Sequence, residues 1–235
     1  MKYMGGKSKI AKHILPIMLA ERSSSHQWWV EPFVGGANII DKVEGRRIGN
    51  DSHKYLIALH KSLQNGWVPP TEVSKEMYYA VKTNQGNYSD ELIGFIGFLC
   101  SFGGKWWDGY AADNSGTNYA ERGSRILVKQ AKSFEGIKFL CGSYLDLEIP
   151  DNSIIYCDPP YEGTRAYKGT FINHVEFWQW CRDKANEGHV VFVSEYNAPD
   201  DFECVKTVEH KTILNKNNPS KRVEKLFRYT GKEGL

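Results

Sequence analysis

The chain has 235 residues and a mass of 26.8 kDa. That length is enough for one α/β domain with a sizeable core and a smaller inserted lobe, and too short for two full-sized domains. With 41% hydrophobic and 25% charged residues, the composition argues against a disordered or fibrous chain, and a net charge of +2 does not by itself indicate binding to nucleic acid.

The cysteines and the apolar runs indicate where the protein works. Five cysteines include no C-x-x-C pair, so the sequence predicts neither a disulfide framework nor a zinc site. No stretch approaches the roughly eighteen apolar residues of a membrane-spanning helix, and no apolar segment of a secretion signal follows the first residues. We therefore expect a cytoplasmic protein with reduced thiols, no metal and no membrane segment.

Short apolar runs bounded by turn residues alternate with segments of helical periodicity. The predicted strands cover residues 27–33, 46–51, 137–144, 153–158 and 189–194. The predicted helices cover residues 53–64, 90–102 and 174–186, with Asp51 or Ser52, Ser89 and Asn173 available as N-caps. Two final runs, 203–214 and 223–230, flank a polar segment and predict an antiparallel pair. This order predicts a Rossmann-like α/β fold: a mainly parallel sheet, helices on both faces, and ligands at the carboxyl ends of the strands.

Residues 67–134 interrupt this alternation, because they are rich in Gly, Asn, Tyr and Trp where another strand would be expected. We interpret them as an inserted region, with the main domain formed by residues 1–66 and 135–235. Within the insertion, residues 101–110 interleave aromatic residues, glycines and Lys105, which is typical of a loop that reads a groove or inserts between bases. A small aromatic core is the structural alternative.

Asp158, Pro159, Pro160 and Tyr161 directly follow the apolar run of residues 154–157. They stand at the carboxyl end of a predicted strand, where doubly wound folds place their ligands. The two prolines remove backbone donors and stiffen the turn, so carbonyl and carboxylate oxygens face a group that donates hydrogen bonds. The exocyclic amine of a flipped-out base fits, with Tyr161 stacked on its face, and an Asp-Pro turn packed by a tyrosine is the structural alternative.

A second motif, EPFVGGA at residues 31–37, follows the first predicted strand. Its paired glycines, Gly35 and Gly36, permit a ligand to approach the backbone closely. Asp51 ends the next strand, close to where doubly wound folds place a carboxylate for ribose hydroxyls, so the two features together indicate an adenosyl ligand. The lone histidines, among them His53 and His60, lie in helical patterns without ligand spacing, and we expect surface or capping roles for them.

In this order, the motifs resemble the Dam-like class of DNA adenine-N6 methyltransferases of bacteria and phages, over nearly the whole chain. Residues 3–7 (YMGGK) are similar to the family's N-terminal cofactor segment, residues 31–37 to its glycine motif, and residues 158–161 to its catalytic tetrapeptide. The resemblance implies S-adenosylmethionine as cofactor and assigns residues 67–134 to recognition of the DNA target. Residues 103–107 do not align with the family's usual recognition loop.

The resemblance also implies the members of each site. We expect Asp158, Pro159, Pro160 and Tyr161 to be catalytic. The expected cofactor-binding residues are Tyr3, Lys7, Glu31, Pro32, Phe33, Gly35, Gly36, Asp51, Tyr144 and Asp158. The expected DNA-binding residues are Lys105, Trp106, Trp107, Arg122 and Arg125. The expected partner is double-stranded DNA, bound by a monomer, with a restriction endonuclease as a further candidate partner.

The expected reaction is a direct transfer, in which adenine N6 attacks the sulfonium methyl group in line. Asp158 and the Pro159 carbonyl accept the amine hydrogens, so orientation and hydrogen bonding supply most of the acceleration. Cytosine-N4 methylation is the nearest alternative, although that group usually opens its tetrapeptide with serine. A catalytically silent nucleic-acid-binding protein on the same fold is another alternative, and so is an enzyme acting on RNA or on a protein glutamine.

Overall fold

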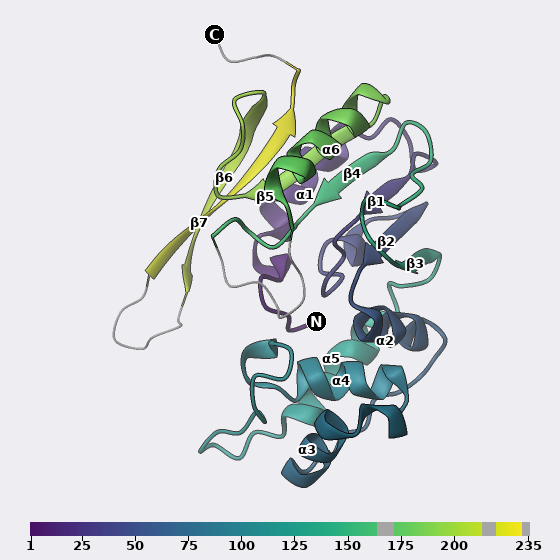
Figure 1. Ribbon diagram of the computed structural model, residues 1–235, viewed down its shortest axis with the longest axis vertical. Coiled ribbons are helices and arrows are strands. Elements are labelled where there is room, and N and C mark those ends of the chain that lie inside the picture. Colours follow the sequence, from purple (N-terminus) through teal and green to yellow (C-terminus); the bar gives the residue numbers. More distant parts are fainter. Residues whose placement is uncertain (164–171, 213–219, 232–235) are drawn as a thin grey trace.

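The structure, a computed structural model, describes residues 1–163, 172–212 and 220–231. Among these residues, seven strands form one sheet in the order β3-β2-β1-β4-β5-β7-β6 (Figure 1). The first five run parallel: β1 Trp29–Glu31, β2 Arg47–Asp51, β3 Ile137–Cys141, β4 Ile154–Cys157 and β5 Val190–Glu195. Each overlaps a predicted run, which confirms the Rossmann-like α/β fold.

The order of the strands brings two distant parts of the chain together. From β1 the chain moves outward through β2 to β3 at one edge of the sheet, and it then returns to place β4 against the other side of β1. The direction of winding therefore reverses between β1 and β4. The crevice at the carboxyl ends of these two strands is where doubly wound sheets bind ligands, so the residues that follow β1 and β4 meet there.

Side chains of the strands alternate between two hydrophobic cores, one on each face of the sheet. On β4, Ile154 and Tyr156 belong to the core that includes α1 (Ala11–Ala20) and α2 (Lys54–Gln64). The intervening Ile155 and Cys157 belong to the core that includes α6 (His174–Asn186), which lies across the front of the sheet in Figure 1. A strand that is buried on both faces must be apolar throughout, which explains the uninterrupted apolar run before the predicted catalytic motif.

The helices of the main domain agree in part with the sequence pattern. α2 and α6 match the predicted helices, and Oδ1 of Asn173 caps α6 by accepting the backbone N–H of Val175 at 3.1 Å. The sequence analysis missed α1 and the short 3-10 helices η1 (Lys7–Lys9) and η2 (Ile40–Lys42). Pro16 lies inside α1 and lacks the N–H of a regular helical residue, so the local sequence disfavours a helix here. Burial of Ile14, Leu15 and Met18 in the core stabilises α1 nevertheless.

A C-terminal hairpin completes the sheet. β6 (Phe202–Thr212) and β7 (Ser220–Tyr229) pair antiparallel, and β7 also pairs antiparallel with β5. They confirm the predicted closing pair, although the strand boundaries differ from the predicted runs and the end of the first run lies outside the described residues. Because β7 runs against β5, its first half reaches the carboxyl ends of the parallel strands, where Lys225 pairs with Glu195.

Residues 67–134 are mainly helical and lie beyond the β1–β3 part of the sheet (Figure 1). Their helices are α3 (Lys75–Thr83), α4 (Asp90–Leu99) and α5 (Tyr119–Ala131), with the 3-10 helices η3 (Gln85–Asn87) and η4 (Phe102–Gly104). Only α4 was predicted, and it ends at Leu99 rather than at residue 102. Phe95 and Phe98 of α4 share one core with Leu56 and Leu59 of α2, so residues 67–134 are packed against α2.

None of the helices in the described ranges is both long and apolar enough to cross a membrane.

Candidate active site

Asp158 directly follows β4 and lies at the point where the winding of the sheet reverses. Its Oδ1 is 2.8 Å from Nζ of Lys7, which belongs to η1. The Lys7 side chain is 5% exposed and that of Asp158 is 21% exposed, so this ion pair is largely shielded from water. The fold therefore joins the N-terminal segment to the motif at residues 158–161, as the proposed shared site requires.

Tyr161 and Glu224 complete a group around this ion pair. The Tyr161 hydroxyl donates a hydrogen bond of 2.5 Å to Oε2 of Glu224. The Lys7 ammonium lies 3.5 Å from the same oxygen and 4.7 Å from the centroid of the Tyr161 ring. We call Lys7, Asp158, Tyr161 and Glu224 the Asp158 cluster. Glu224 was not predicted from the sequence, because it lies in a strand of mixed charge without a recognisable motif.

Burial and charge set the protonation of the Asp158 cluster. Burial raises the pKa of Asp158 to about 6, the Lys7 ammonium opposes this rise, and the Glu224 carboxylate adds to it. For Lys7, burial lowers the pKa, but the attraction of Asp158 and Glu224 exceeds that effect and leaves the pKa raised. The ammonium is therefore charged at neutral pH, and Asp158 titrates close to the pH at which a proton acceptor is most effective.

Glu195, the last residue of β5, places another buried carboxyl group near the cluster. Its Oε2 accepts the backbone N–H of Glu162 at 3.1 Å, and its Oε1 accepts the N–H of Tyr196 at 2.7 Å. Since Glu162 follows Tyr161, these bonds tie the end of the tetrapeptide to β5. Burial raises the pKa of Glu195 to about 7. Glu195 was not predicted as a site residue, although it ends an apolar strand much as Asp158 follows one.

Gly35 and Gly36 are in close contact with Tyr3. Gly35 has a left-handed φ of 46°, and a Cβ atom there would lie 3.0 Å from Cε1 of Tyr3. At Gly36 a Cβ atom would lie 2.8 Å from the Cβ of Tyr3. In the structure, the side chain that closely approaches the paired glycines is therefore that of Tyr3, which was itself expected to bind the cofactor. Direct contact of these three residues with the cofactor stays a prediction.

Asp51 ends β2 and hydrogen-bonds to the glycine motif. Its Oδ2 accepts the N–H of Gly35 at 3.0 Å, and its Oδ1 accepts the N–H of His53 at 2.9 Å. Burial raises the pKa of Asp51, and these two hydrogen bonds oppose the rise. Each carboxylate oxygen retains a lone pair that can accept a ribose hydroxyl.

The two histidines near this motif have different environments. His53, instead of the predicted Asp51 or Ser52, occupies the N-cap position of α2, but its side chain makes no capping hydrogen bond. His60 is fully buried with Nε2 at 2.8 Å from the Gly35 carbonyl oxygen, so the expectation of a surface or capping role was wrong for this residue. Burial lowers the pKa of His60 to about 4, which leaves the imidazole neutral at pH 7. The α2 helix therefore supports the glycine motif from inside the core.

Glu31 and Pro32 make contacts that fix the path of the chain out of β1. The Glu31 carboxylate is 3% exposed and accepts a hydrogen bond of 2.8 Å from Nε1 of Trp29. Burial raises its pKa well above the usual range. The Pro32 carbonyl accepts a hydrogen bond of 3.1 Å from Nδ2 of Asn50. These contacts hold the start of the glycine motif in place, and the cofactor-binding roles of Glu31 and Pro32 stay predictions.

Phe33 and Tyr144 meet beyond the carboxyl ends of β1 and β3. Their ring centroids are 5.0 Å apart, and Phe33 also lies 5.8 Å from the ring of Phe177 in α6. Within the described part of the chain, the buried hydroxyl of Tyr144 has no hydrogen-bond partner. A buried hydroxyl in that state costs free energy unless a ligand or water pairs with it. The cofactor-binding roles of Phe33 and Tyr144 stay predictions.

Trp106 and Trp107, which we expected to contact DNA, pack against side chains of α2, α3 and α4. The Trp106 ring stacks on Tyr55 at 5.5 Å and lies 4.7 Å from Phe98. The Trp107 ring lies 5.1 Å from Tyr78. Both tryptophans are partly buried against the main core. The structure thus contains the small aromatic core that was the alternative interpretation of residues 101–110.

Phe102 is the large apolar residue of this loop that faces solvent. Its side chain is 64% exposed at the start of η4. An antiparallel bridge between Ser101 and Tyr110 closes the loop behind it. The carbonyl of Gly104 accepts a hydrogen bond of 3.4 Å from the N–H of Met4, so the loop also contacts the N-terminal segment that leads to Lys7.

The remaining residues expected to bind DNA carry accessible positive charges. Nζ of Lys105 lies 3.3 Å from Oδ2 of Asp108, and the Lys105 side chain is 42% exposed. Arg122 and Arg125 are exposed on α5. Exposed cations of this kind can contact phosphates, and the DNA-binding roles of all three stay predictions.

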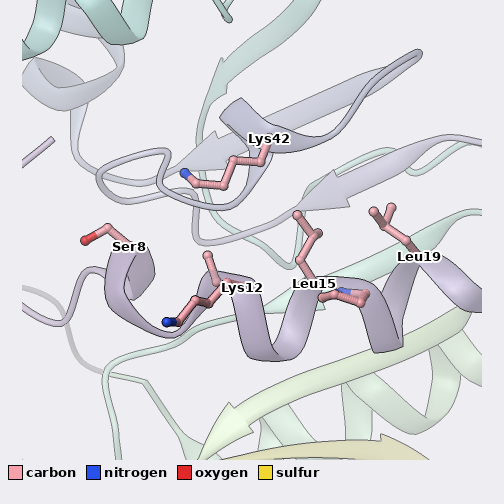
Figure 2. Close-up of a pocket in the computed structure, with 7 residues that line it drawn as sticks. Ser8, Lys12, Leu15, Leu19 and Lys42 are labelled. Atoms are coloured by element: carbon pink, nitrogen blue, oxygen red, sulfur yellow. The ribbon is translucent and has the colours of Figure 1, made fainter. Parts of the chain in front are cut away.

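A hollow of about 240 Å³ lies beside α1 (Figure 2), and none of the residues that line it belongs to the Asp158 cluster. It is lined by Ser8, Ala11, Lys12, Leu15, Pro16, Leu19 and Lys42. Its floor is aliphatic, and we assign no role to it. In the described ranges, no three His, Cys, Asp or Glu side chains are grouped so that they could hold a metal ion.

Solved structures with partial similarity include several methyltransferases. An RNA methyltransferase from Salinibacter ruber in complex with S-adenosyl-L-homocysteine has a TM-score of 0.40 and 10% identity, with 95% of this chain and 94% of that chain covered. The tRNA (m1A58) methyltransferase TrmI from Aquifex aeolicus has a TM-score of 0.39 and 10% identity, with 93% and 68% covered. Similarities of this size carry no argument about fold or activity. None of the curated proteins matches the chain.

The model of the D12 class N6 adenine-specific DNA methyltransferase family matches residues 3–94, which include the N-terminal segment, the glycine motif and Asp51. The methyl donor of that family is S-adenosylmethionine. The residues present fit this group: Asp51 offers acceptors for ribose hydroxyls, and Tyr144 has a buried hydroxyl that lacks a partner in the described structure. The match over residues 3–94 supports the Dam-like family of adenine-N6 methyltransferases for this chain, with S-adenosylmethionine as the methyl donor.

Proposed function

We propose that the protein methylates N6 of a flipped-out adenine in duplex DNA, and that Asp158, Pro159, Pro160 and Tyr161 are its catalytic residues. The observation that carries this proposal is the position of Asp158 and Tyr161. A carboxylate and an aromatic ring lie together in a largely buried cluster at the carboxyl end of β4, next to the glycine motif. A planar base with an exocyclic amine needs both an acceptor for its hydrogens and a ring to stack on.

The chain's own groups orient and deprotonate the amine. S-adenosylmethionine supplies an electrophilic methyl group when it is bound. Asp158 accepts a hydrogen bond from N6, and the Pro159 carbonyl accepts the other amine hydrogen, so the nitrogen lone pair is aligned for transfer. With its pKa near 6, Asp158 is largely ionised at neutral pH and can take the proton that N6 loses. Tyr161 holds the plane of the base.

Residues 67–134 form the DNA-recognition region in this proposal, and residues 1–66 and 135–235 form the catalytic domain. Phe102 supports this division, because a largely exposed aromatic side chain on a closed loop can insert between bases. Lys105, Arg122 and Arg125 would contact phosphates. Trp106 and Trp107 would then support the loop from beneath instead of touching DNA.

We further propose that the protein acts as a monomer. Lys7, Asp158, Tyr161 and Glu224 all come from one chain, so the cluster needs no residue from a second copy. A restriction endonuclease as a partner stays a prediction.

The test is incubation of the protein with labelled S-adenosylmethionine and unmethylated bacterial DNA, followed by nucleoside digestion and mass spectrometry. We expect N6-methyladenine. N4-methylcytosine would contradict the choice of base. Cofactor binding without any methylated base would contradict DNA as the acceptor and would direct the search to RNA or a protein glutamine, or to a binding protein without activity.

A further inference from the structure

Glu224 reaches the catalytic motif from the far end of the chain. It lies on β7, one residue before Lys225, which pairs with Glu195 at the carboxyl end of β5. β7 runs antiparallel to its neighbour β5, so the first half of β7 lies at the edge of the sheet where β5 ends. This direction brings Glu224 to the catalytic motif. Its side chain is 12% exposed and directed at two members of the cluster, Lys7 and Tyr161. The hairpin thus contributes a charged group to a site that is otherwise built from the parallel strands.

The Lys7 ammonium contacts both of the groups to which the proposed function assigns the target base. It lies 2.8 Å from Oδ1 of Asp158 and 4.7 Å from the centroid of the Tyr161 ring. An adenine whose amine bonds to Asp158 and whose ring stacks on that face of Tyr161 would displace it. Among the described residues, Glu224 is the other carboxylate within ion-pair distance: its Oε2 lies 3.5 Å from Nζ, so a small movement would bring the ammonium into a closer ion pair with Glu224.

We propose that Glu224 is a positioning residue for methyl transfer: it fixes the Tyr161 ring through the hydroxyl and receives the Lys7 ammonium when the target amine takes its place at Asp158. This inference rests on the proposed function, because it assumes that Asp158 and Tyr161 bind the target base. Without Glu224, no carboxylate of the described residues other than Asp158 lies within 4 Å of the Lys7 ammonium, and a buried unpaired charge is costly. Lys7 would then stay on Asp158 and compete with the base.

The charge around Asp158 gives this role a measurable signature. The titratable groups whose interaction with Asp158 is resolved are Lys7, Glu224, Tyr161, Tyr156 and Cys157, together with Glu31 of β1 and Glu195 of β5. Of these, Lys7 and a side-chain hydrogen bond from Tyr161 lower the pKa of Asp158, and Glu224 raises it. Removing the Glu224 charge takes away one repulsive neighbour of Asp158 and the second carboxylate beside the Lys7 ammonium. Both changes favour the ionised form of Asp158 and lower its pKa.

The test compares Glu224→Gln with Glu203→Gln, an exposed glutamate on the neighbouring strand of the same hairpin. The glutamine keeps an oxygen for the Tyr161 hydroxyl but has no charge for Lys7, whereas Tyr161→Phe removes the hydroxyl alone. We expect Glu224→Gln to lower kcat on adenine-containing duplex DNA about tenfold with unchanged S-adenosylmethionine affinity. We also expect the acid limb of its pH profile to move to lower pH, while Glu203→Gln behaves as the unchanged protein.

A readout without cofactor or DNA makes the result independent of turnover. In protein labelled with ¹³C at the aspartate carboxyl groups, the Asp158 signal is identified by its loss in Asp158→Asn, and we expect it to titrate at lower pH in Glu224→Gln. If the Asp158 titration and kcat were both unchanged in a folded Glu224→Gln protein, the role of Glu224 would be overturned and the proposed function would stand. Full activity of Asp158→Ala would instead overturn the proposed function on which it rests.

Discussion

The carboxyl edge of the sheet and residues 67–134 differ in how well the sequence predicted the positions of their side chains. At the sheet edge, Asp158 and Lys7 come together in one cluster, as motifs far apart in the chain were expected to do. In the insertion, the aromatic residues that the sequence singled out, Trp106 and Trp107, pack inward, and Phe102 faces solvent. The topology of a parallel sheet determines which residues lie at the carboxyl ends of its strands. In an irregular loop, packing determines which side chains are buried and which are exposed.

Among the substitutions that test this comparison, replacing Asp158 should have the largest effect. In Asp158→Ala, the amine loses its acceptor, and we expect kcat for adenine methylation to fall by about a hundredfold to a thousandfold. Steady-state kinetics on duplex DNA would measure this, with circular dichroism to show that the variant is folded. Activity near that of the unchanged protein would mean that the edge of the sheet does not carry the chemistry.

Trp106→Ala tests whether the aromatic cluster of the insertion is a core. The Trp106 ring fills the space beside Gly97, where a Cβ atom would lie 2.2 Å from the ring, and it stacks on Tyr55. Losing it should lower the free energy of unfolding by about 3 kcal/mol, as for other large core deletions. Urea denaturation measures this. An unchanged midpoint together with weaker DNA binding would instead make Trp106 a DNA-contacting residue.

The pH dependence of stability tests the buried carboxyl of Glu195. Because burial raises the pKa of Glu195 from the ordinary value of 4.5 to about 7, the contribution of this group to stability is fully present below pH 4.5 and is lost as the pH rises through 7. Between pH 5 and pH 8, we expect the protein to lose about 2 kcal/mol more unfolding free energy than Glu195→Gln does. Urea unfolding at both pH values measures the difference. Equal losses in the two proteins would show that Glu195 titrates normally.

Phe102→Ala should give the smallest effect and the clearest contrast with Trp106. The side chain is exposed, so the free energy of unfolding should change little. We expect duplex DNA to bind about tenfold more weakly, because one base-stacking contact is lost. Val175→Ala is the matched control, since Val175 is 80% exposed on α6, outside the inserted region. Fluorescence anisotropy with labelled duplex measures both, and equal affinities would remove Phe102 from the DNA interface.

Sequence patterns were sufficient where the cause is local. The alternation of apolar runs and helical segments predicted the parallel sheet, and a strand buried on both faces shows as the unbroken run before Asp158. Asn173 was predicted as the N-cap of α6 because asparagine favours that position. In the structure, its side chain accepts the backbone N–H groups two and three residues further on. The position of Asp158 at a strand's end and the paired glycines of the second motif are likewise visible in the chain.

Only the tertiary structure decided which side chains those motifs would meet. Glu224 is one of many charged residues in the sequence, and it enters the Asp158 cluster because β7 runs antiparallel beside β5. His60 lies in an ordinary amphipathic helix pattern, and the packing of α2 buries it against Gly35. Trp106 and Phe102 have similar hydrophobicity, and the fold alone places one inside and the other outside. Such choices depend on contacts between residues far apart in the chain, which local propensity and spacing do not encode.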